Sequence, residues 1–190
     1  MNTLVFATHN VHKVEEVLAM LKDRVNVVDL EELMFFDTIP ETGNNLSDNA
    51  LQKAHFIREK IGLDCFADDT GLEVDALNGE PGVISARYAG EPSDSERNID
   101  KLLQKLSNNT NRNAQFRCVI ALILNNETHL FEGIVRGRIA TERFGHKGFG
   151  YDSIFIPDGY EKTFAQLLPE EKNKISHRSL AVKQLSDFFS

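Results

Sequence analysis

Four polar clusters interrupt the apolar pattern of this 190-residue chain, and their residue types suit chemistry on an anionic ligand. The first cluster is the stretch Thr8-His9-Asn10-Val11-His12-Lys13, which separates an apolar run from a helical pattern. Backbone N–H groups at a helix N-terminus, together with the charge of Lys13, favour a bound anion. The stretch lacks the GxxxxGK[ST] spacing of a Walker loop. The alternative is that Asn10 only caps the helix and Lys13 is solvated.

Carboxylates form the second cluster. Asp68 and Asp69 follow a buried apolar run, and Glu41 opens a separate loop. Oxygen ligands of this kind suit Mg²⁺. Because neighbouring side chains on a strand point to opposite faces, one aspartate would bind metal while the other orients water or a partner residue. The alternative is a turn in which an aspartate caps backbone N–H groups.

Glycines and aromatic residues form the third cluster, Lys147-Gly148-Phe149-Gly150-Tyr151-Asp152. Two glycines beside Phe149 allow the backbone to approach a ligand closely, and Phe149 or Tyr151 could stack on a purine ring. The alternative is a glycine-rich turn whose aromatic residues belong to the core.

Basic residues and a histidine form the fourth cluster, Lys172-Asn173-Lys174-Ile175-Ser176-His177-Arg178. A purine with an oxygen at position 6 presents an acceptor where adenine presents a donor amine. An arginine or backbone N–H facing that atom would therefore favour hypoxanthine or xanthine over adenine. The alternative is a solvated basic loop.

Alternating strands and helices must position these clusters. Periodicity predicts strands over residues 3–7, 25–30, 65–67, 116–124, 128–140 and 153–156. It predicts helices after Asn10, over residues 46–61 with Gly62 as the stop, from a Ser93-x-x-Glu96 capping box, and near the C-terminus. Asn125-Asn126 is a plausible hairpin turn. Early alternation followed by a hairpin indicates a mixed-sheet α/β fold in one domain, residues 1–190.

Composition excludes several classes of protein. The net charge of −8, from 21 basic and 29 acidic residues, argues against a general nucleic-acid coat. Cys65 and Cys118 lie in apolar runs and are expected to be buried thiols. The N-terminal residues do not resemble a signal peptide, and no apolar run is long enough to span a membrane, so we expect a cytoplasmic protein.

Taken in order, six short motifs resemble those of the inosine triphosphate pyrophosphatase family, which acts on non-canonical purine nucleotides. They span almost the whole chain: Ala7-Thr8-x-Asn10-x-x-Lys13; Glu41-Thr42-Gly43 with Asn49-Ala50 and Lys53-Ala54; Ala67-Asp68-Asp69-Thr70-Gly71-Leu72; Pro81-Gly82-x-x-Ser85-Ala86-Arg87-Tyr88; Gly148-Phe149-Gly150-Tyr151-Asp152; and Ser176-His177-Arg178.

The resemblance implies hydrolysis of ITP, dITP and XTP to the monophosphate and pyrophosphate, with Mg²⁺, by a homodimer. It also implies an elongated mixed sheet flanked by helices, with a central cleft between two lobes. The implied site residues are as follows: Thr8, His9, Asn10, Val11, His12 and Lys13 for the triphosphate; Glu41 and Asp69 for the metal, with Asp69 also the proton acceptor; Thr70 for substrate; Phe149, Gly150, Tyr151 and Asp152 for base and sugar; Lys172, His177 and Arg178 for base and phosphate.

Two departures from the family pattern fall in the site. Many relatives carry glycine where this chain has His9 and His12, and Thr70 replaces a common serine while keeping the hydroxyl. Two other functions remain open from the sequence. One is a Maf-like pyrophosphatase that acts on modified pyrimidine nucleotides or dTTP. The other is a nucleotide-binding regulatory module without turnover.

Overall fold

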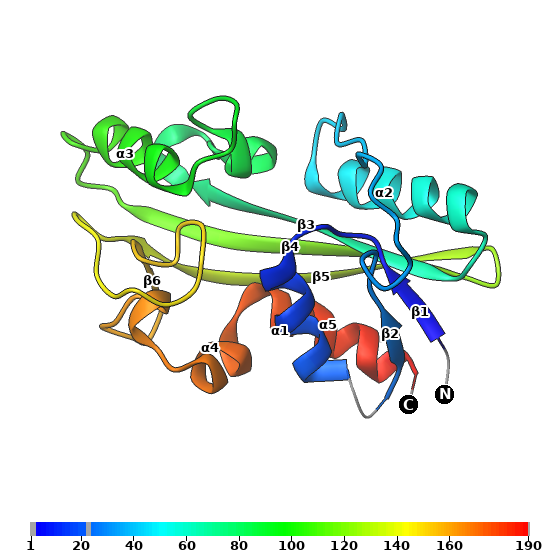
Figure 1. Ribbon diagram of the computed structural model, residues 1–190. Helices are drawn as coiled ribbons and strands as arrows, with labels where there is room; N and C mark the ends of the chain where they lie inside the picture. Colours follow the sequence, from blue (N-terminus) through cyan, green and yellow to red (C-terminus); the bar gives the residue numbers. More distant parts are fainter. Residues whose placement is uncertain (1–2, 22–23, 190) are drawn as a thin grey trace. The chain divides into compact units, whose positions relative to one another are not determined.

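The computed structural model describes residues 3–21 and 24–189 (Figure 1). In chain order, its helices and strands are β1 (Thr3–Phe6), α1 (Val11–Leu21), β2 (Asn26–Val28), α2 (Leu46–Ile61), β3 (Cys65–Val74), η1 (Asp75–Leu77), η2 (Gly82–Arg87), α3 (Ser95–Lys105), β4 (Asn113–Leu124), β5 (Glu127–Ile139), β6 (Phe155–Pro157), η3 (Phe164–Gln166), α4 (Pro169–Ile175) and α5 (His177–Phe188). The elements labelled η are short 3₁₀-helices.

All six of these strands belong to one sheet, in the order β2-β1-β3-β4-β5-β6. Strand β1 pairs in parallel with β2 and with β3, whereas β5 pairs antiparallel with β6. Asn125 and Asn126 have φ angles of 50° and 66° and connect β4 directly to β5. Positive φ at both residues is the geometry that a two-residue hairpin requires, and asparagine tolerates it. The structure therefore confirms the predicted mixed-sheet α/β fold and its hairpin.

The chain divides into two compact units. Unit 1 contains Met1–Asp69, Cys118–Gly133 and Arg178–Ser190, and unit 2 contains Thr70–Arg117 and Ile134–His177. The boundaries fall inside β3, β4 and β5, so each of these long strands contributes residues to both units. A single functional domain over residues 1–190 and a cleft between lobes stay predictions.

Unit 1 is built around β1 and the first half of β3. The Phe6 and Phe66 rings stack at a centroid distance of 4.5 Å and pack with residues of α1 and α5, including Leu21 and Leu185. Helix α2 lies on the opposite side of these strands (Figure 1). Its Gly62 has a φ of 79° and donates its N–H to the Arg58 carbonyl, which confirms the predicted glycine stop. Both faces of these strands are therefore covered by helices.

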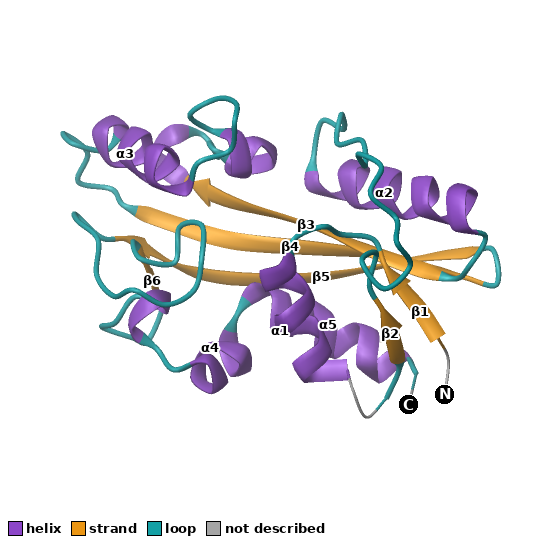
Figure 2. Cartoon of the chain, viewed as in Figure 1, coloured by secondary structure: helices purple, strands orange, loops and turns teal. Residues whose placement is uncertain are grey.

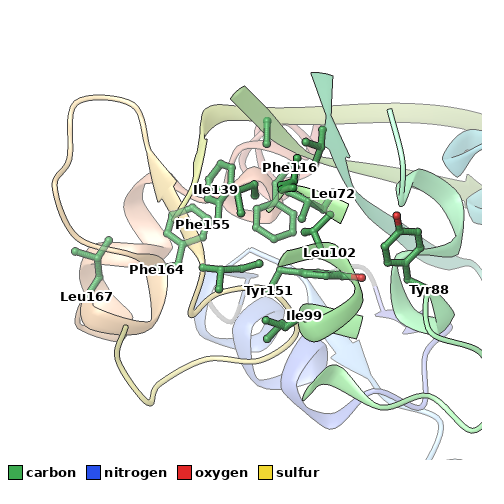
Figure 3. Packing of buried hydrophobic residues seen from close by; sticks show 14 residues of the cluster. Leu72, Tyr88, Ile99, Leu102, Phe116, Ile139, Tyr151, Phe155, Phe164 and Leu167 are labelled. Atoms are coloured by element: carbon green, nitrogen blue, oxygen red, sulfur yellow. The ribbon is translucent and has the colours of Figure 1, made fainter. Parts of the chain in front are cut away.

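Unit 2 has its own apolar core, shown in Figure 3. Phe116 of β4 contacts Phe155 of β6 edge to face at 4.7 Å, and Phe164 lies 6.1 Å from Phe116. Leu102 of α3 and the Tyr151 ring belong to the same buried cluster. This core lies in the unit that carries the third sequence cluster, residues 147–152.

Two local predictions need correction, and one helix has no counterpart in the sequence prediction. Strand β3 continues to Val74, so Asp68 and Asp69 lie within the strand and not beyond its end. The apolar run stops at these two charged residues, which suggested that the strand ends there. The strand continues because ion pairs inside the protein satisfy both charges. Helix α3 is capped by Asp94, whose side chain accepts from the N–H groups of Glu96 and Arg97, so the Ser93 capping box is wrong. Helix α4 was not predicted, and its seven residues are too few to show a clear period.

Both cysteines are buried free thiols, as expected. Among the helices formed by the described residues, none is both long enough and apolar enough to cross a membrane.

Candidate active site

The first cluster forms the connection between β1 and α1. Lys13 donates its backbone N–H to the Asn10 carbonyl at 3.0 Å and lies 3.3 Å from the Asn10 side-chain oxygen. The Asn10 N–H in turn binds the Thr8 hydroxyl at 3.2 Å. Asn10 therefore acts as a helix cap, as the alternative for this cluster expects. The resulting helix N-terminus still suits an anion, because capping satisfies only part of its N–H groups.

Lys13 is not solvated, so the second half of that alternative is wrong. Its ammonium group lies 2.8 Å from Oδ1 of Asp68, and the Lys13 side chain is mostly buried. Asp68 Oδ2 accepts from Nε of Arg178 at 3.2 Å, and Arg178 also pairs with Glu16 of α1. We call these four residues, Lys13, Glu16, Asp68 and Arg178, the arginine cluster. It joins α1, β3 and α5 through two positive and two negative charges.

Burial alone would raise the pKa of Asp68, because a carboxylate loses hydration inside the protein. The positive charges of Lys13 and Arg178 outweigh that effect and hold the pKa of Asp68 well below its usual range. The pKa of Arg178 is raised, since Asp68 and Glu16 outweigh the desolvation of its guanidinium. Asp68 and Arg178 are therefore both ionised at neutral pH.

Asp69 faces the other side of β3, toward α2. Its Oδ2 accepts from the Asn49 amide at 3.0 Å, and its Oδ1 lies 3.4 Å from the ammonium group of Lys53. The same ammonium group lies 2.6 Å from Oε1 of Glu41. We call Glu41, Lys53 and Asp69 the carboxylate cluster. Asp68 and Asp69 thus contact different partners on opposite faces of the strand, and the division of metal binding and water orientation between them stays a prediction.

The pKa shifts in the carboxylate cluster follow from burial and charge. Burial raises the pKa of Asp69, and the nearby charges of Lys53 and Lys13 only partly offset it. For Lys53, burial lowers the pKa, but the combined attraction of the aspartates and Glu41 leaves it above the ordinary value. Lys53 is thus a permanent cation, whereas Asp69 is a carboxylate that takes up a proton more readily than a surface aspartate.

Side chains of α2 hold the loop that carries Glu41. The Asn49 oxygen accepts from the Gly43 N–H at 2.7 Å, and the Gln52 oxygen accepts from the Thr42 N–H at 2.8 Å. A Cβ atom on Gly43 would lie 2.6 Å from Cβ of Asp48, so only glycine fits this close approach. Asn49 thereby connects the loop after Glu41 to Asp69.

The donor set of the carboxylate cluster fits a magnesium ion. Two carboxylates converge on the single cation of Lys53, which shows that this position stabilises positive charge. No group of three or more His, Cys, Asp or Glu side chains that could hold a metal occurs within residues 3–21 and 24–189. Mg²⁺ is usually bound through one or two carboxylates, with water and substrate phosphate as its other ligands. Glu41 and Asp69 provide that number of carboxylates.

The third cluster folds into a turn around Asp152 in unit 2. Asp152 Oδ2 accepts from the Phe149 N–H at 2.9 Å and from the Lys172 ammonium at 2.8 Å. Gly148 has a φ of 75°, and a Cβ atom there would lie 2.1 Å from the Asp152 carboxylate. The glycine is therefore needed for the carboxylate to reach into its own turn. Phe149 is half-buried, and the ammonium of Lys172 lies 5.1 Å from the centroid of its ring.

Tyr151 and His177 were expected to contact the purine base, but both side chains are buried among protein residues. Tyr151 is buried in the core and donates its hydroxyl to the Ser85 carbonyl at 2.8 Å (Figure 3). Of the two aromatic candidates for base stacking, Phe149 is the more accessible. The His177 ring is buried and stacks on Phe116 at 4.6 Å. Lys172, His177 and Arg178 are all buried, so the alternative of a solvated basic loop is wrong.

The remaining site residues lie beside these groups in the chain. Thr70 follows Asp69 within β3 and is partly exposed. Val11 and His12 form the exposed start of α1, and Gly150 has a φ of 59° in the turn before Asp152. His9 is exposed, and its contacts are described below. No described contact assigns these residues to a ligand, so their roles stay predictions.

Sequence reasoning assigned no role to Asn49, Lys53 or Glu16. A signal existed for the first two. Asn49 and Lys53 are four residues apart and occupy the same helix face as Ala50, Ala54 and Ile57, so they interrupt the buried stripe of α2 with polar groups. Buried polar side chains require partners, and here the partners are Asp69 and Glu41.

A model of the Ham1 family matches residues 4–188. The chain belongs to the Ham1 family. It is 52% identical to the dITP/XTP pyrophosphatase of Flavobacterium psychrophilum over 98% of both chains, and 46% identical to that of Bacillus subtilis over 98% of this chain and 96% of the relative. The solved structure of the Staphylococcus aureus Ham1 protein is 44% identical, with a TM-score of 0.89 over 98% of this chain and 97% of that chain. These comparisons confirm the resemblance found in the motifs.

Proposed function

We propose that this protein hydrolyses the non-canonical purine nucleoside triphosphates ITP, dITP and XTP to the monophosphate and pyrophosphate, and so clears them from the nucleotide pool. The observation that carries the proposal is the buried carboxylate of Asp69, oriented by Asn49 and Lys53 beside Glu41. The relatives named dITP/XTP pyrophosphatase support the choice of substrate.

Asp69 is the proposed proton acceptor for water that attacks the α-phosphorus. Its raised pKa makes it a stronger base than an ordinary aspartate, and the hydrogen bonds from Asn49 and Lys53 fix the direction of its carboxylate. Mg²⁺ bound by Glu41 and Asp69 would neutralise charge on the phosphate oxygens. The combination links base catalysis and charge neutralisation in one cluster.

The triphosphate is assigned to residues 8–13 at the N-terminus of α1. Lys13 already contacts Asp68, but an ammonium group has three donors and can also bind a phosphate oxygen. Lys13 and Lys172 would stabilise the pyrophosphate leaving group. Thr70 would contact the substrate through its hydroxyl. Positive charge and N–H donors together suit a polyanionic substrate.

Base recognition is assigned to residues 149–152 and to Lys172, His177 and Arg178. Phe149 would stack on the purine, and its backbone N–H is held by the Asp152 carboxylate. The guanidinium of Arg178 is held by carboxylates of β3 and α1, so its direction is well defined. A donor of fixed direction near purine position 6 would donate a hydrogen bond to an oxygen there, whereas the amine of adenine offers no acceptor.

Three further properties belong to the proposal. Oxygen ligands favour Mg²⁺ as the metal over softer ions. Family resemblance supports a homodimer. A cytoplasmic location follows from the substrate, which is a free nucleotide, and the net charge of −8 does not favour nucleic acid as an alternative partner. We propose neither a nucleic-acid nor a membrane partner.

The direct test is Asp69→Asn, assayed for pyrophosphate release from ITP with Mg²⁺. We expect a loss of about 100-fold or more in kcat, the usual contribution of a positioned general base. The matched control is Asp187→Asn, because Asp187 forms an exposed pair with Lys183 near the C-terminus. Turnover by Asp69→Asn within threefold of the unchanged protein would remove Asp69 from the catalytic role.

The comparisons do not support the Maf-like alternative, because the relatives that match over the full chain are named dITP/XTP pyrophosphatases. Pyrophosphate release above background with Mg²⁺ would also eliminate a binding module without turnover. Such a module would need the positive charges of the first cluster but would have no use for the carboxylate cluster.

A further inference from the structure

We propose that His9 is a positioning residue whose side chain joins the substrate loop, residues 8–13, to the segment that leads to the metal ligand Glu41. The proposal rests on the proposed function, which gives these two segments the triphosphate and the metal. Figure 2 shows the second segment as the long loop between β2 and α2. All of the residues concerned belong to unit 1.

His9 makes two contacts with this loop. Its Nε2 lies 3.0 Å from the carbonyl oxygen of Asp37, so the Nε2–H tautomer donates a hydrogen bond to the backbone. Its ring is parallel to that of Phe35, with an interplanar angle of 6° and a centroid distance of 6.4 Å. Phe35 in turn meets Phe56 of α2 edge to face at 6.3 Å. The three rings connect the substrate loop to α2.

A tight turn gives Phe35 this orientation. The Phe35 N–H binds the Leu30 carbonyl and the Met34 N–H binds the Glu31 carbonyl, both at 2.9 Å, which is the pattern that ends a helical turn. Met34 has a φ of 52°, a conformation that usually requires glycine. Met34 and Phe36 are 78% and 70% exposed, while Phe35 between them is partly buried. Of the two neighbouring aromatic residues in this turn, Phe35 packs against the protein and Phe36 points into solvent.

Glu41 lies between two points of attachment. On its C-terminal side, Thr42 and Gly43 bind side chains of α2. On its N-terminal side, the His9 side chain contacts Phe35 and Asp37. A glycine at position 9 would keep the loop backbone but make neither contact. His9 thus acts through Asp37 and Phe35. It holds the substrate loop and the Glu41 segment in the positions in which they would bind the triphosphate and its metal ion.

The first experiment measures hydrogen–deuterium exchange of the protein without nucleotide or metal. We expect His9→Ala to exchange faster than the unchanged protein over both residues 8–13 and residues 35–41. His55→Ala is the matched control, because His55 is exposed on α2 and outside the site. Unchanged exchange over residues 35–41 in His9→Ala would overturn the proposal, and would be the result if the imidazole served only as a phosphate donor.

The second experiment separates KM from kcat for ITP with Mg²⁺. We expect His9→Ala to raise KM about threefold to tenfold, with kcat changed less than about twofold, because a lost hydrogen bond loosens the loop without touching the reacting atoms. His9→Gln retains an amide donor and should recover part of the KM effect. An unchanged KM in His9→Ala, or an equal rise in His55→Ala, would overturn the proposal.

The two experiments also separate this proposal from the proposed function. Failure of the unchanged protein to hydrolyse ITP would contradict the proposed function alone, while the exchange of residues 35–41 would still decide whether His9 holds the loop. Normal hydrolysis together with unchanged exchange in His9→Ala would contradict only the role of His9.

Discussion

Asp68→Asn removes one negative charge from the interior of unit 1. Asp68 is 1% exposed, and its two oxygens contact the ammonium of Lys13 at 2.8 Å and Nε of Arg178 at 3.2 Å. Breaking a buried ion pair by removing one partner typically costs about 3–5 kcal/mol. Arg178 keeps Glu16 as a partner and asparagine keeps one oxygen acceptor, so we expect a loss at or below the lower limit of that range, about 2–3 kcal/mol.

The assay is urea unfolding at pH 7, supported by thermal unfolding. A loss of about 2–3 kcal/mol lowers Tm by roughly 4–12 °C for a chain of this size. Asp187→Asn, which breaks an exposed pair, should change the stability by less than about 1 kcal/mol. A loss below about 1 kcal/mol for Asp68→Asn would refute the reasoning, because it would mean that the buried charges do not depend on Asp68.

The pH dependence of the same comparison tests the sign of the pKa shift. The folded-state pKa of Asp68 lies below the unfolded value of about 3.9, so its contribution to stability is fully present above that value. The contribution is lost as the pH falls toward the folded-state pKa. The difference in stability between the unchanged protein and Asp68→Asn should therefore be constant from pH 8 to about 5 and shrink in stronger acid. A difference that grows in acid would contradict the shift.

The other predictions concern catalysis. Burial raises the pKa of Asp69, and catalysis needs its ionised form. A pH–rate profile should therefore show kcat/KM falling in acid, with the fall at a higher pH than an ordinary aspartate would give. Asp152→Asn weakens the contacts to Phe149 and Lys172 and should raise KM for ITP about tenfold with a smaller change in kcat, as steady-state kinetics would show. Removal of divalent ions with EDTA should abolish pyrophosphate release, and added Mg²⁺ should restore it, because Glu41 and Asp69 are hard oxygen ligands; restoration of higher turnover by Zn²⁺ than by Mg²⁺ would contradict this.

Local periodicity was enough to predict much of the fold. The apolar stripe of α2 and its glycine stop mark that helix, and the asparagine pair marks the β4–β5 hairpin. The full length of β3 could not be predicted, because its polar residues Asp68 and Asp69 are compatible with a buried strand only when Arg178 and Lys53, distant in sequence, supply partners. Pairing over such separations leaves no local pattern.

In the candidate site, too, the residue types could be predicted from the sequence but their long-range pairing could not. Its residue types were visible in the motifs, including the carboxylates and the glycine-rich turn. Which lysine pairs with which carboxylate was not visible, since Lys13 binds Asp68 and Lys53 binds Asp69 across opposite faces of one strand. The role of the His9 side chain also depends on a loop turn near Phe35 that has no strong sequence signal.

The most direct test of the central claim is hydrolysis in ¹⁸O-labelled water with Mg²⁺, using ITP, XTP and dITP beside ATP, dTTP and UTP. The account predicts that the 6-oxo purine nucleotides are hydrolysed far faster than the others, and that the label appears in the phosphate of the nucleoside monophosphate. Label in the pyrophosphate, release of orthophosphate as the first product, or faster turnover of ATP or dTTP than of ITP would contradict it.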